Sequence, residues 1–431
     1  MRQRLETLRG SLFFVPMAYV VAAIALSQAS LVADQAISES SWRLPTLLAA
    51  TVDSARALLS TVAAATITFA GIAFSVSLLT FQLASSQFSP RVLYGLFRDP
   101  FSKRVIGVAL GTFTFSLLVL RVVRRPLEDG GAPVIPHVSV LIALVLGIIA
   151  ILAILAFINH SAHSMEAAEI IRRITEETRE QIAKICPHPA GEGPKGHVLG
   201  SLPEGPPYPV RALDDGWVQD IDESGLLSAA AAGGVVRLDA GTGMFVAAGA
   251  RLCTIWPSPE DPDAAARAAR GAIRRGRTRT MRQDLALGFR QLADIALRAL
   301  SPGVNDPTTA REAIVHIGSA LREILARDLP PRVIKDESER RLFRPHDWTH
   351  EDYVDLAFGE IRHAATGHPG VVAVLIEVMG AVASDSEEAS PTRAELVRSR
   401  AALALEAFEL TAAMEADRAM VRKAAEGAGL P

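Results

Sequence analysis

The sequence predicts an α-helical membrane protein with a four-helix transmembrane region and a cytoplasmic part that holds a small β-module followed by a helical bundle. Two observations carry this prediction. Four long apolar runs all lie within the first 160 of 431 residues, and the rest of the chain is polar and charged. The mean hydropathy of +0.25 is high for a chain with 21% charged residues. This indicates that apolar and charged residues are concentrated in different parts of the chain. We therefore expect the first 160 residues in the bilayer and the longer remainder in water.

The four apolar runs set the expected spans at residues 10–33, 57–90, 105–120 and 138–158. A helix needs about 20 apolar residues to cross the hydrocarbon core. The third run is short, but it extends to Val123 if Arg121 snorkels along the helix. No Asp or Glu lies in any of the four runs, so a proton relay or an acidic ring is not favoured.

Lys and Arg set the expected orientation. They gather before the first run, between the second and third, and after the fourth, more than in the other two connections. The positive-inside rule then places both termini in the cytoplasm.

The chain divides into four expected regions: a transmembrane domain at 1–160, an amphipathic extension and Pro/Gly-rich linker at 161–209, a β-module at 210–258, and a helical domain at 259–431. Alternating residues and glycine turns predict strands at 217–221, 235–239, 244–246 and 252–256, around a helical piece at 226–232. The apolar run 371–382 is too short to span and contains Glu377, so we expect a buried core helix. Residues 392–426 read as one long helix that stops at Gly427.

One face of the second apolar run repeats a polar side chain every seven residues: Thr61, Thr68, Ser75, Gln82 and Ser89. The same face carries small residues: Ala57, Ala64 and Gly71. Positions seven residues apart differ by only ~20° around the axis of a helix, so these residues form one stripe. Polar groups in lipid face protein or water, and two readings stay open. The stripe lines a pathway for an ion or small polar solute, or it packs as a helix seam, for instance against Gly107, Gly111, Thr112 and Ser116 of the third run.

A second polar cluster lies in the cytoplasmic region: Arg279, Gln283, Asp284, Arg298, Ser301, Asn305 and Asp306. One reading is a pocket for an anion or polar ligand. The other is helix capping, with Thr280 and Gln283 as a capping box, and Asp306 before Pro307 as a second N-cap. His346 and His350 precede an amphipathic pattern and suggest the start of a helix.

Few other functions have support in the sequence. No lipase, P-loop, dinucleotide or zinc-protease pattern occurs, so an enzyme is not favoured. Cys186 and Cys253 have no spacing for a metal site, and the net charge of −3 argues against nucleic-acid binding. We expect no cofactor and no metal. The expected partners are the lipid bilayer and further copies of the chain.

Three motifs together resemble one family. They are the segments QLASSQFSPR at 82–91, RTMRQD at 279–284 and ALSPGVNDP at 299–307. They are similar to the signatures of a large bacterial family of predicted membrane proteins classified as a domain of unknown function. The resemblance implies an inner-membrane protein with four spans and a cytoplasmic domain, and it implies no activity. Thr308 departs from the family pattern, where an aromatic residue is usual.

The sequence thus leaves two main functions. The leading one is an oligomeric channel or transport-like assembly that a cytoplasmic domain regulates. The alternative is a membrane-anchored sensor or scaffold that binds a polar ligand or partner through its cytoplasmic helical domain.

Overall fold

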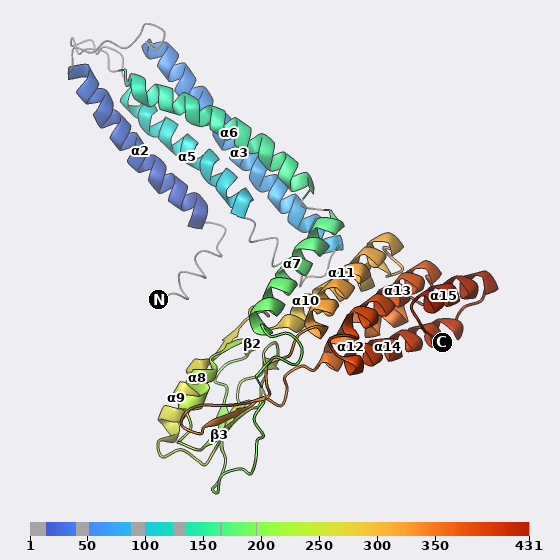
Figure 1. The fold of residues 1–431 in the computed structure, drawn as a ribbon. Helices are drawn as coiled ribbons and strands as arrows, with labels where there is room; N and C mark the ends of the chain where they lie inside the picture. Colours follow the sequence, from blue (N-terminus) through green and yellow to red (C-terminus); the bar gives the residue numbers. More distant parts are fainter. Residues whose placement is uncertain are drawn as a thin grey trace. The chain divides into compact units, whose positions relative to one another are not determined.

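A computed structural model describes residues 14–39, 51–87, 100–123, 135–163, 166–194 and 196–430. The chain forms two compact units, Met1–Glu166 and Ala167–Pro431, which we call the N-terminal and C-terminal units (Figure 1).

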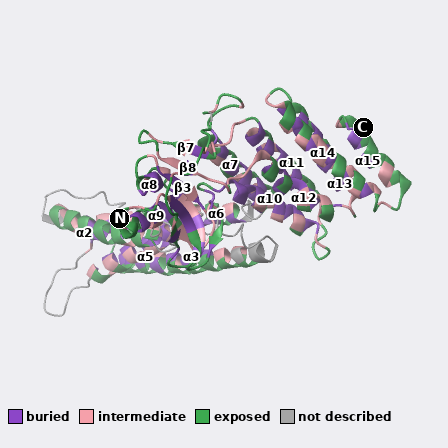
Figure 2. Cartoon of the chain, turned by 90° about the horizontal axis from the view of Figure 1, so that it is seen from below, coloured by how far each residue is buried: buried purple, intermediate pink, exposed green. Residues whose placement is uncertain are grey.

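The described part of the N-terminal unit is made of four long helices: α2 (Phe14–Glu39), α3 (Val52–Gln87), α5 (Pro100–Val122) and α6 (His137–His163). Helix α5 contacts each of the other three, and α6 also contacts α2 and α3. Most of the side chains that α6 leaves exposed are large and aliphatic, such as Leu152, Leu155 and Ile158. A helix that is apolar on all sides suits a lipid environment. Figure 2 shows long exposed stretches on these helices, whereas buried residues dominate α10.

Glycines of α5 form the seam with α2. A Cβ atom at Gly107 would lie 2.7 Å from the Tyr19 ring, and one at Gly111 would lie 3.2 Å from the Tyr19 carbonyl oxygen. Small residues of this kind let two membrane helices approach closely. The small face of α5 therefore receives α2.

Asp34 lies just beyond the first expected run, which ends at residue 33. Helix α2 continues past residue 33, and its apolar stretch Phe14–Ile37 contains Asp34. The carboxylate accepts hydrogen bonds from the Val138 and Ser139 backbone N–H groups at 2.8 and 3.0 Å, and from Ser139 Oγ at 2.6 Å. The first N–H groups of a helix have no partner inside it. Asp34 therefore fastens α2 to the start of α6.

Five described helices are long and apolar enough to cross a membrane: the four above and α13 (Pro369–Ser386). The count of four spans therefore stays a prediction. Burial separates the fifth helix from the others. Inside its own unit, α13 buries 56% of its apolar stretch, against 22–44% for the other four. It packs against α11, α14 and α15.

The C-terminal unit contains two sheets. A five-stranded sheet has the order β1-β5-β3-β8-β7 and a three-stranded sheet the order β4-β2-β6. Their strands are β1 (Tyr208–Arg211), β2 (Gly216–Ile221), β3 (Val235–Leu238), β4 (Phe245–Val246), β5 (Arg251–Trp256), β6 (Ile273–Gly276), β7 (Val333–Lys335) and β8 (Arg341–Phe343). Val236, Leu252, Ile255 and Leu342 are fully buried in the core that the sheets share.

Three of these strands lie outside the range 210–258 expected for the β-module. Strand β6 pairs with β2, and β8 pairs with β3 in parallel while β7 pairs with β8. The three strands are short and rich in Arg and Lys, so they carry little alternation. Parallel pairing also requires a long crossover, which joins segments that are distant in the sequence.

The helices of the C-terminal unit are α7 (Ala167–Ile185), α8 (Glu223–Ser228), α9 (Pro262–Ala272), α10 (Leu285–Ala299), α11 (Pro307–Leu325), α12 (His350–Ala364), α13, α14 (Pro391–Glu409) and α15 (Glu415–Gly427). Helix α10 contacts α7, α11 and α12. The single helix expected at 392–426 is wrong, because the chain turns back between α14 and α15. This turn lets both helices pack on α13 and bury Phe408 and Val421.

Candidate functional site

The repeated polar face of α3 is exposed in the chain. Thr61, Thr68, Ser75 and Gln82 are all exposed, as are Ala57, Ala64 and Gly71, and we call these seven residues the α3 stripe. Ser89 lies outside the described residues. The buried face of α3 is a different one: Ala55, Leu59, Ala63, Thr66, Ala70 and Ala73. The α3 stripe is therefore not the face through which α3 packs in its own chain, and Gly107 and Gly111 receive Tyr19 instead.

The hydroxyl groups of the stripe have local partners. Thr61 Oγ1 donates to the Ala57 carbonyl oxygen and Thr68 Oγ1 to that of Ala64, both at 2.8 Å. A hydroxyl has one proton to donate and two lone pairs that accept. Because the proton is used inside the helix, these oxygens present acceptor lone pairs outward. Gln82 adds an exposed amide.

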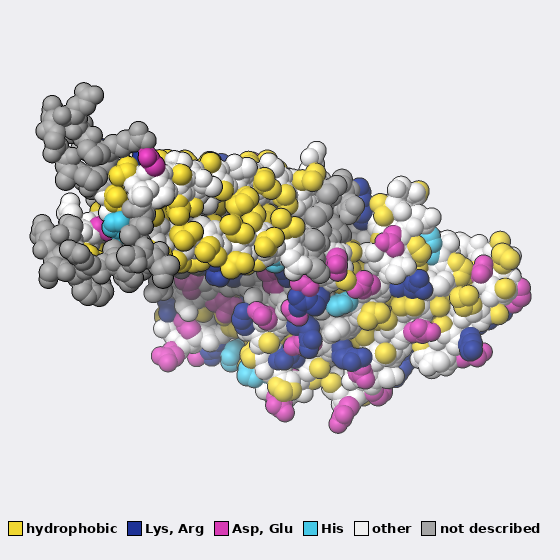
Figure 3. Space-filling view, turned by 90° about the horizontal axis from the view of Figure 1, so that it is seen from above, with side chains coloured by type: hydrophobic (Ala, Val, Ile, Leu, Met, Phe, Trp, Pro, Cys, Tyr) yellow, Lys and Arg dark blue, Asp and Glu magenta, His cyan; other side chains and the backbone are white. Residues whose placement is uncertain are grey.

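Large apolar side chains surround the stripe. Ile67, Ile72 and Phe74 are exposed on other faces of α3, between 41% and 45% of each residue's surface. Figure 3 shows hydrophobic side chains over much of the described surface of the N-terminal unit in that view, whereas charged side chains are spread over the C-terminal unit. A strip of small and polar residues inside such a surface is suited to contact with protein or water.

The seven candidate residues of the C-terminal unit fall into two groups at opposite ends of α10. Arg279, Gln283 and Asp284 precede the helix, and Ser301, Asn305 and Asp306 follow it. The 15 residues of α10 span about 22 Å at 1.5 Å per residue. Arg298 lies in the last turn of α10, with the second group. The structure therefore does not bring the seven together in one pocket.

The first group joins a sheet to α10. Arg279 donates two hydrogen bonds to the Asp284 carboxylate, at 2.8 and 2.9 Å, and only 2% of the Asp284 side chain is exposed. Asp284 also caps α10 by accepting from Leu287 N. The Arg279 guanidinium lies 5.8 Å from the centre of the Trp217 ring in β2. Gly243 is needed here, because a Cβ atom would lie 2.4 Å from Asp284 Oδ2.

Thr280 is not the N-cap of α10, which corrects the capping box expected there. The helix begins one turn later, behind Asp284. Gln283 turns to β2 instead, where its Oε1 accepts from Ile221 N at 2.9 Å and its Nε2 donates to Ile221 O at 3.2 Å. A side chain can complete a strand edge as well as a helix end, and the sequence does not distinguish the two.

The second group forms the connection between α10 and α11. Ser301 Oγ donates to the Arg298 carbonyl oxygen, and the Asn305 and Asp306 N–H groups donate to Ser301 O and Ala299 O. Asn305 has a φ of 50°, a region that Asn tolerates better than most residues. Asp306 caps α11, as the sequence predicts, by accepting from the Thr308 and Thr309 N–H groups. The backbone groups of this loop and the side chains of Ser301 and Asp306 therefore serve the fold.

Replacement of Asp306 tests its role as the cap of α11, and the loss of stability should depend on pH. The hydrogen bond from the Thr309 hydroxyl, at 2.6 Å, is the largest cause that lowers the pKa of Asp306 below its ordinary 3.8. A lowered pKa stabilises the fold above pH 3.8, and this contribution is lost as the pH falls through the folded value. We expect Asp306→Ala to cost about 1 kcal/mol in urea unfolding at pH 7. The cost should shrink below pH 3.8. Asp306→Asn is the control, which keeps the cap but should lose the pH dependence.

A groove between α13 and α15 has no counterpart in the sequence patterns. It is lined mainly by small residues, together with Glu377 and Lys423. A single helix at 392–426 would not form this groove, because only the turn between α14 and α15 brings Lys423 beside α13. The described residues contain no cluster of His, Cys, Asp and Glu that could hold a metal ion.

Comparison with known proteins gives one family. The family model described as predicted membrane protein (DUF2254) matches residues 9–381. An uncharacterized protein of Mycobacterium bovis and another of Mycobacterium tuberculosis are each 31% identical over 384 residues, which is 87% of this chain and 72% of each relative. No solved structure matches the chain. The matched residues include the α3 stripe and all seven candidates of the C-terminal unit.

Proposed function

Because the chain belongs to the family of predicted membrane proteins (DUF2254), we propose that several copies assemble in the bilayer through the α3 stripe as a channel or transport-like assembly. The observation that carries the proposal is the exposure of the whole stripe in the single chain. In lipid, exposed hydroxyl and amide groups are costly, so a stripe that repeats them needs protein or water opposite it.

The chemistry of the stripe limits the solute. The described stripe offers hydroxyl oxygens and one amide, and it contains no charged side chain. Divalent cations bind through several oxygen ligands that commonly include carboxylates. The proposed solute is therefore a monovalent ion or a small neutral polar molecule.

The C-terminal unit has an organising or regulatory role in this proposal. Its polar residues join a sheet to a helix bundle through Arg279, Gln283 and Asp284. The distribution of Lys and Arg around the apolar runs supports cytoplasmic termini and an inner-membrane location.

Solute flux through reconstituted vesicles tests the pathway. We expect the full chain to accelerate efflux of potassium ions or uptake of labelled glycerol over empty vesicles. The double variant Ser75→Val, Gln82→Leu should slow that flux roughly tenfold, since polar contacts in membranes are worth ~0.6 kcal/mol each and 1.4 kcal/mol is a factor of ten. Gln82→Leu keeps the approximate side-chain size, and Ser75→Val replaces the hydroxyl by two methyl groups.

Leu152→Ala is the matched control, because Leu152 is 60% exposed on the aliphatic face of α6. It should leave the flux unchanged. Equal flux in the wild type and the double variant would rule out the stripe as a pathway for these two solutes. Vesicles that leak no faster with the wild-type chain than without it would count against transport of either one.

A further inference from the structure

The groove between α13 and α15 has a volume of about 620 Å³ and a floor of small residues. Gly380, Ala381 and Ser384 come from α13, and Ala424, Gly427 and Ala428 from α15 or the residue that follows it. Gly380 is held close to the C-terminal turn, because a Cβ atom there would lie 2.4 Å from the Ala428 Cβ. Ala381, Ser384 and Gly427 are the exposed residues of this floor, and their short side chains leave room for a facing surface.

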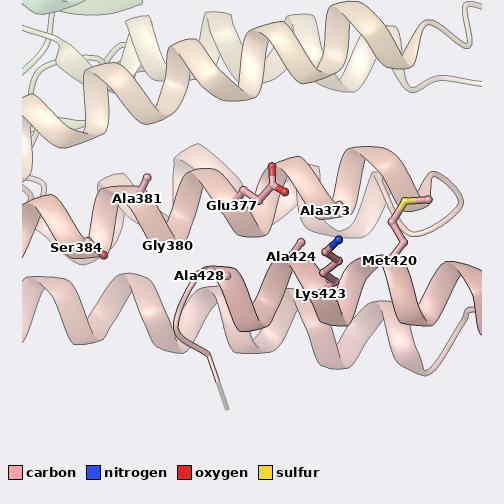
Figure 4. A pocket seen from close by; sticks show the side chains of 10 residues that line it. Ala373, Glu377, Gly380, Ala381, Ser384, Met420, Lys423, Ala424 and Ala428 are labelled. Atoms are coloured by element: carbon pink, nitrogen blue, oxygen red, sulfur yellow. The ribbon is translucent and has the colours of Figure 1, made fainter.

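Two opposite charges line the groove without a partner. Figure 4 shows Glu377 on α13 and Lys423 on α15, with small side chains between them. Neither makes an ion pair or a hydrogen bond with another described residue. Charged residues of the neighbouring helices differ, since Arg398 pairs with Glu387, Arg400 with Asp355 and Arg422 with Glu409.

A groove with one unpaired acid and one unpaired base is complementary to itself. In a two-fold contact the same patch occurs on both copies, so residue i of one meets residue j of the other and the reverse. Glu377 of each copy would then face Lys423 of the partner, which forms two equal ion pairs. Met420, which is 50% exposed at the groove, adds a flexible apolar side chain that adapts to a facing surface.

We infer that the α13–α15 groove binds the same groove of a second copy of this chain across a two-fold axis, with Glu377 and Lys423 pairing in trans. This contact lies in the C-terminal unit and is separate from the α3 stripe. It gives the assembly a second interface, outside the membrane-helix contact, through which the C-terminal units organise each other in pairs.

Charge reversal with a cross-linking readout tests the inference in the full chain in native membranes. Ala381→Cys places a thiol on the groove floor, and Cys186 and Cys253 are both buried, so they contribute little background. A short bis-maleimide should join two copies of this variant. On the same background, Glu377→Lys or Lys423→Glu should lower the dimer yield about fivefold, because each change turns both symmetric attractions into repulsions.

Variants that restore the two ion pairs show whether the partner is a second copy of this chain. The double reversal Glu377→Lys, Lys423→Glu should recover the dimer within one protein. Co-expression of the two single variants with different tags should recover a mixed dimer, which a contact inside one chain does not produce. Glu388→Lys, an exposed reversal beyond the end of α13, should leave the yield unchanged.

Three outcomes would overturn the inference: single reversals that leave the yield intact, a double reversal as weak as the singles, or cross-links to a different protein only. Unfolding curves that coincide with those of the wild type show that the reversals still fold. Cross-linking through a cysteine in the α3 stripe should be unaffected by any of them, so failure here leaves the proposed membrane assembly standing.

Discussion

Replacement of Arg279 by alanine should destabilise the C-terminal unit by about 3–5 kcal/mol, because it leaves the buried Asp284 carboxylate without its cation. The Asp284 side chain is 2% exposed and receives both Arg279 hydrogen bonds. The same change removes the guanidinium that lies near the Trp217 ring. Urea unfolding of the full chain, followed by circular dichroism, measures the loss.

Arg322→Ala is the matched control for this prediction. Arg322 pairs with Asp385, and both side chains are about half exposed, so this change should cost no more than ~1 kcal/mol. Arg279→Lys should fall between the two, since lysine keeps the charge but cannot make the paired hydrogen bonds. Equal costs for the Arg279 and Arg322 alanine variants would contradict the role of the buried pair.

Substitution of Gly288 by leucine is expected to break the contact between α7 and α10. A Cβ atom at Gly288 would lie 2.1 Å from Thr178 Oγ1 and 3.0 Å from Thr178 Cβ. Thr178 is fully buried and its hydroxyl already donates to Ile174 O. The Thr178 side chain therefore has no free volume into which it could move. Overpacking of this kind costs about 3 kcal/mol, to be measured as the loss in the free energy of unfolding.

Two variants separate this contact from the general effect of changing a glycine. Gly359→Ala on α12 has nothing within 4 Å of the added Cβ, and it should be neutral or stabilise the helix by up to about 1 kcal/mol. Thr178→Ala should lessen the cost of Gly288→Ala. An unfolding midpoint of Gly288→Leu that matches the wild type would show that α7 does not pack on α10 in this way.

Local patterns predict much of the chain. The apolar stripe of Ile170, Ile171, Ile174 and Ile182 is buried as its spacing indicates, and Asp306 caps the helix that follows it. Both features depend on residues that are close to one another in the sequence. Membership of the membrane-protein family is confirmed, because the family model matches residues 9–381 and relatives are 31% identical over 87% of the chain.

Features that depend on distant segments are not predicted. Strand β8 pairs with β3 across about a hundred residues, and no local alternation marks it. The turn between α14 and α15 contains no Gly or Pro, and it forms because both helices pack on α13. Whether the α3 stripe is covered or exposed also depends on tertiary packing. Its heptad spacing shows that the residues share a face, but only the packing of α5 and α6 shows that this face is left open.

Cysteine cross-linking at the α3 stripe tests the central claim, that copies of this chain meet there. Ala64 and Leu152 are both exposed in the single chain, one in the middle of the stripe and the other on the aliphatic face of α6. In native membranes treated with an oxidant, Ala64→Cys should form a disulfide-linked dimer and Leu152→Cys should remain a monomer. Dimers from Leu152→Cys with none from Ala64→Cys would contradict the account, because the stripe would then face lipid.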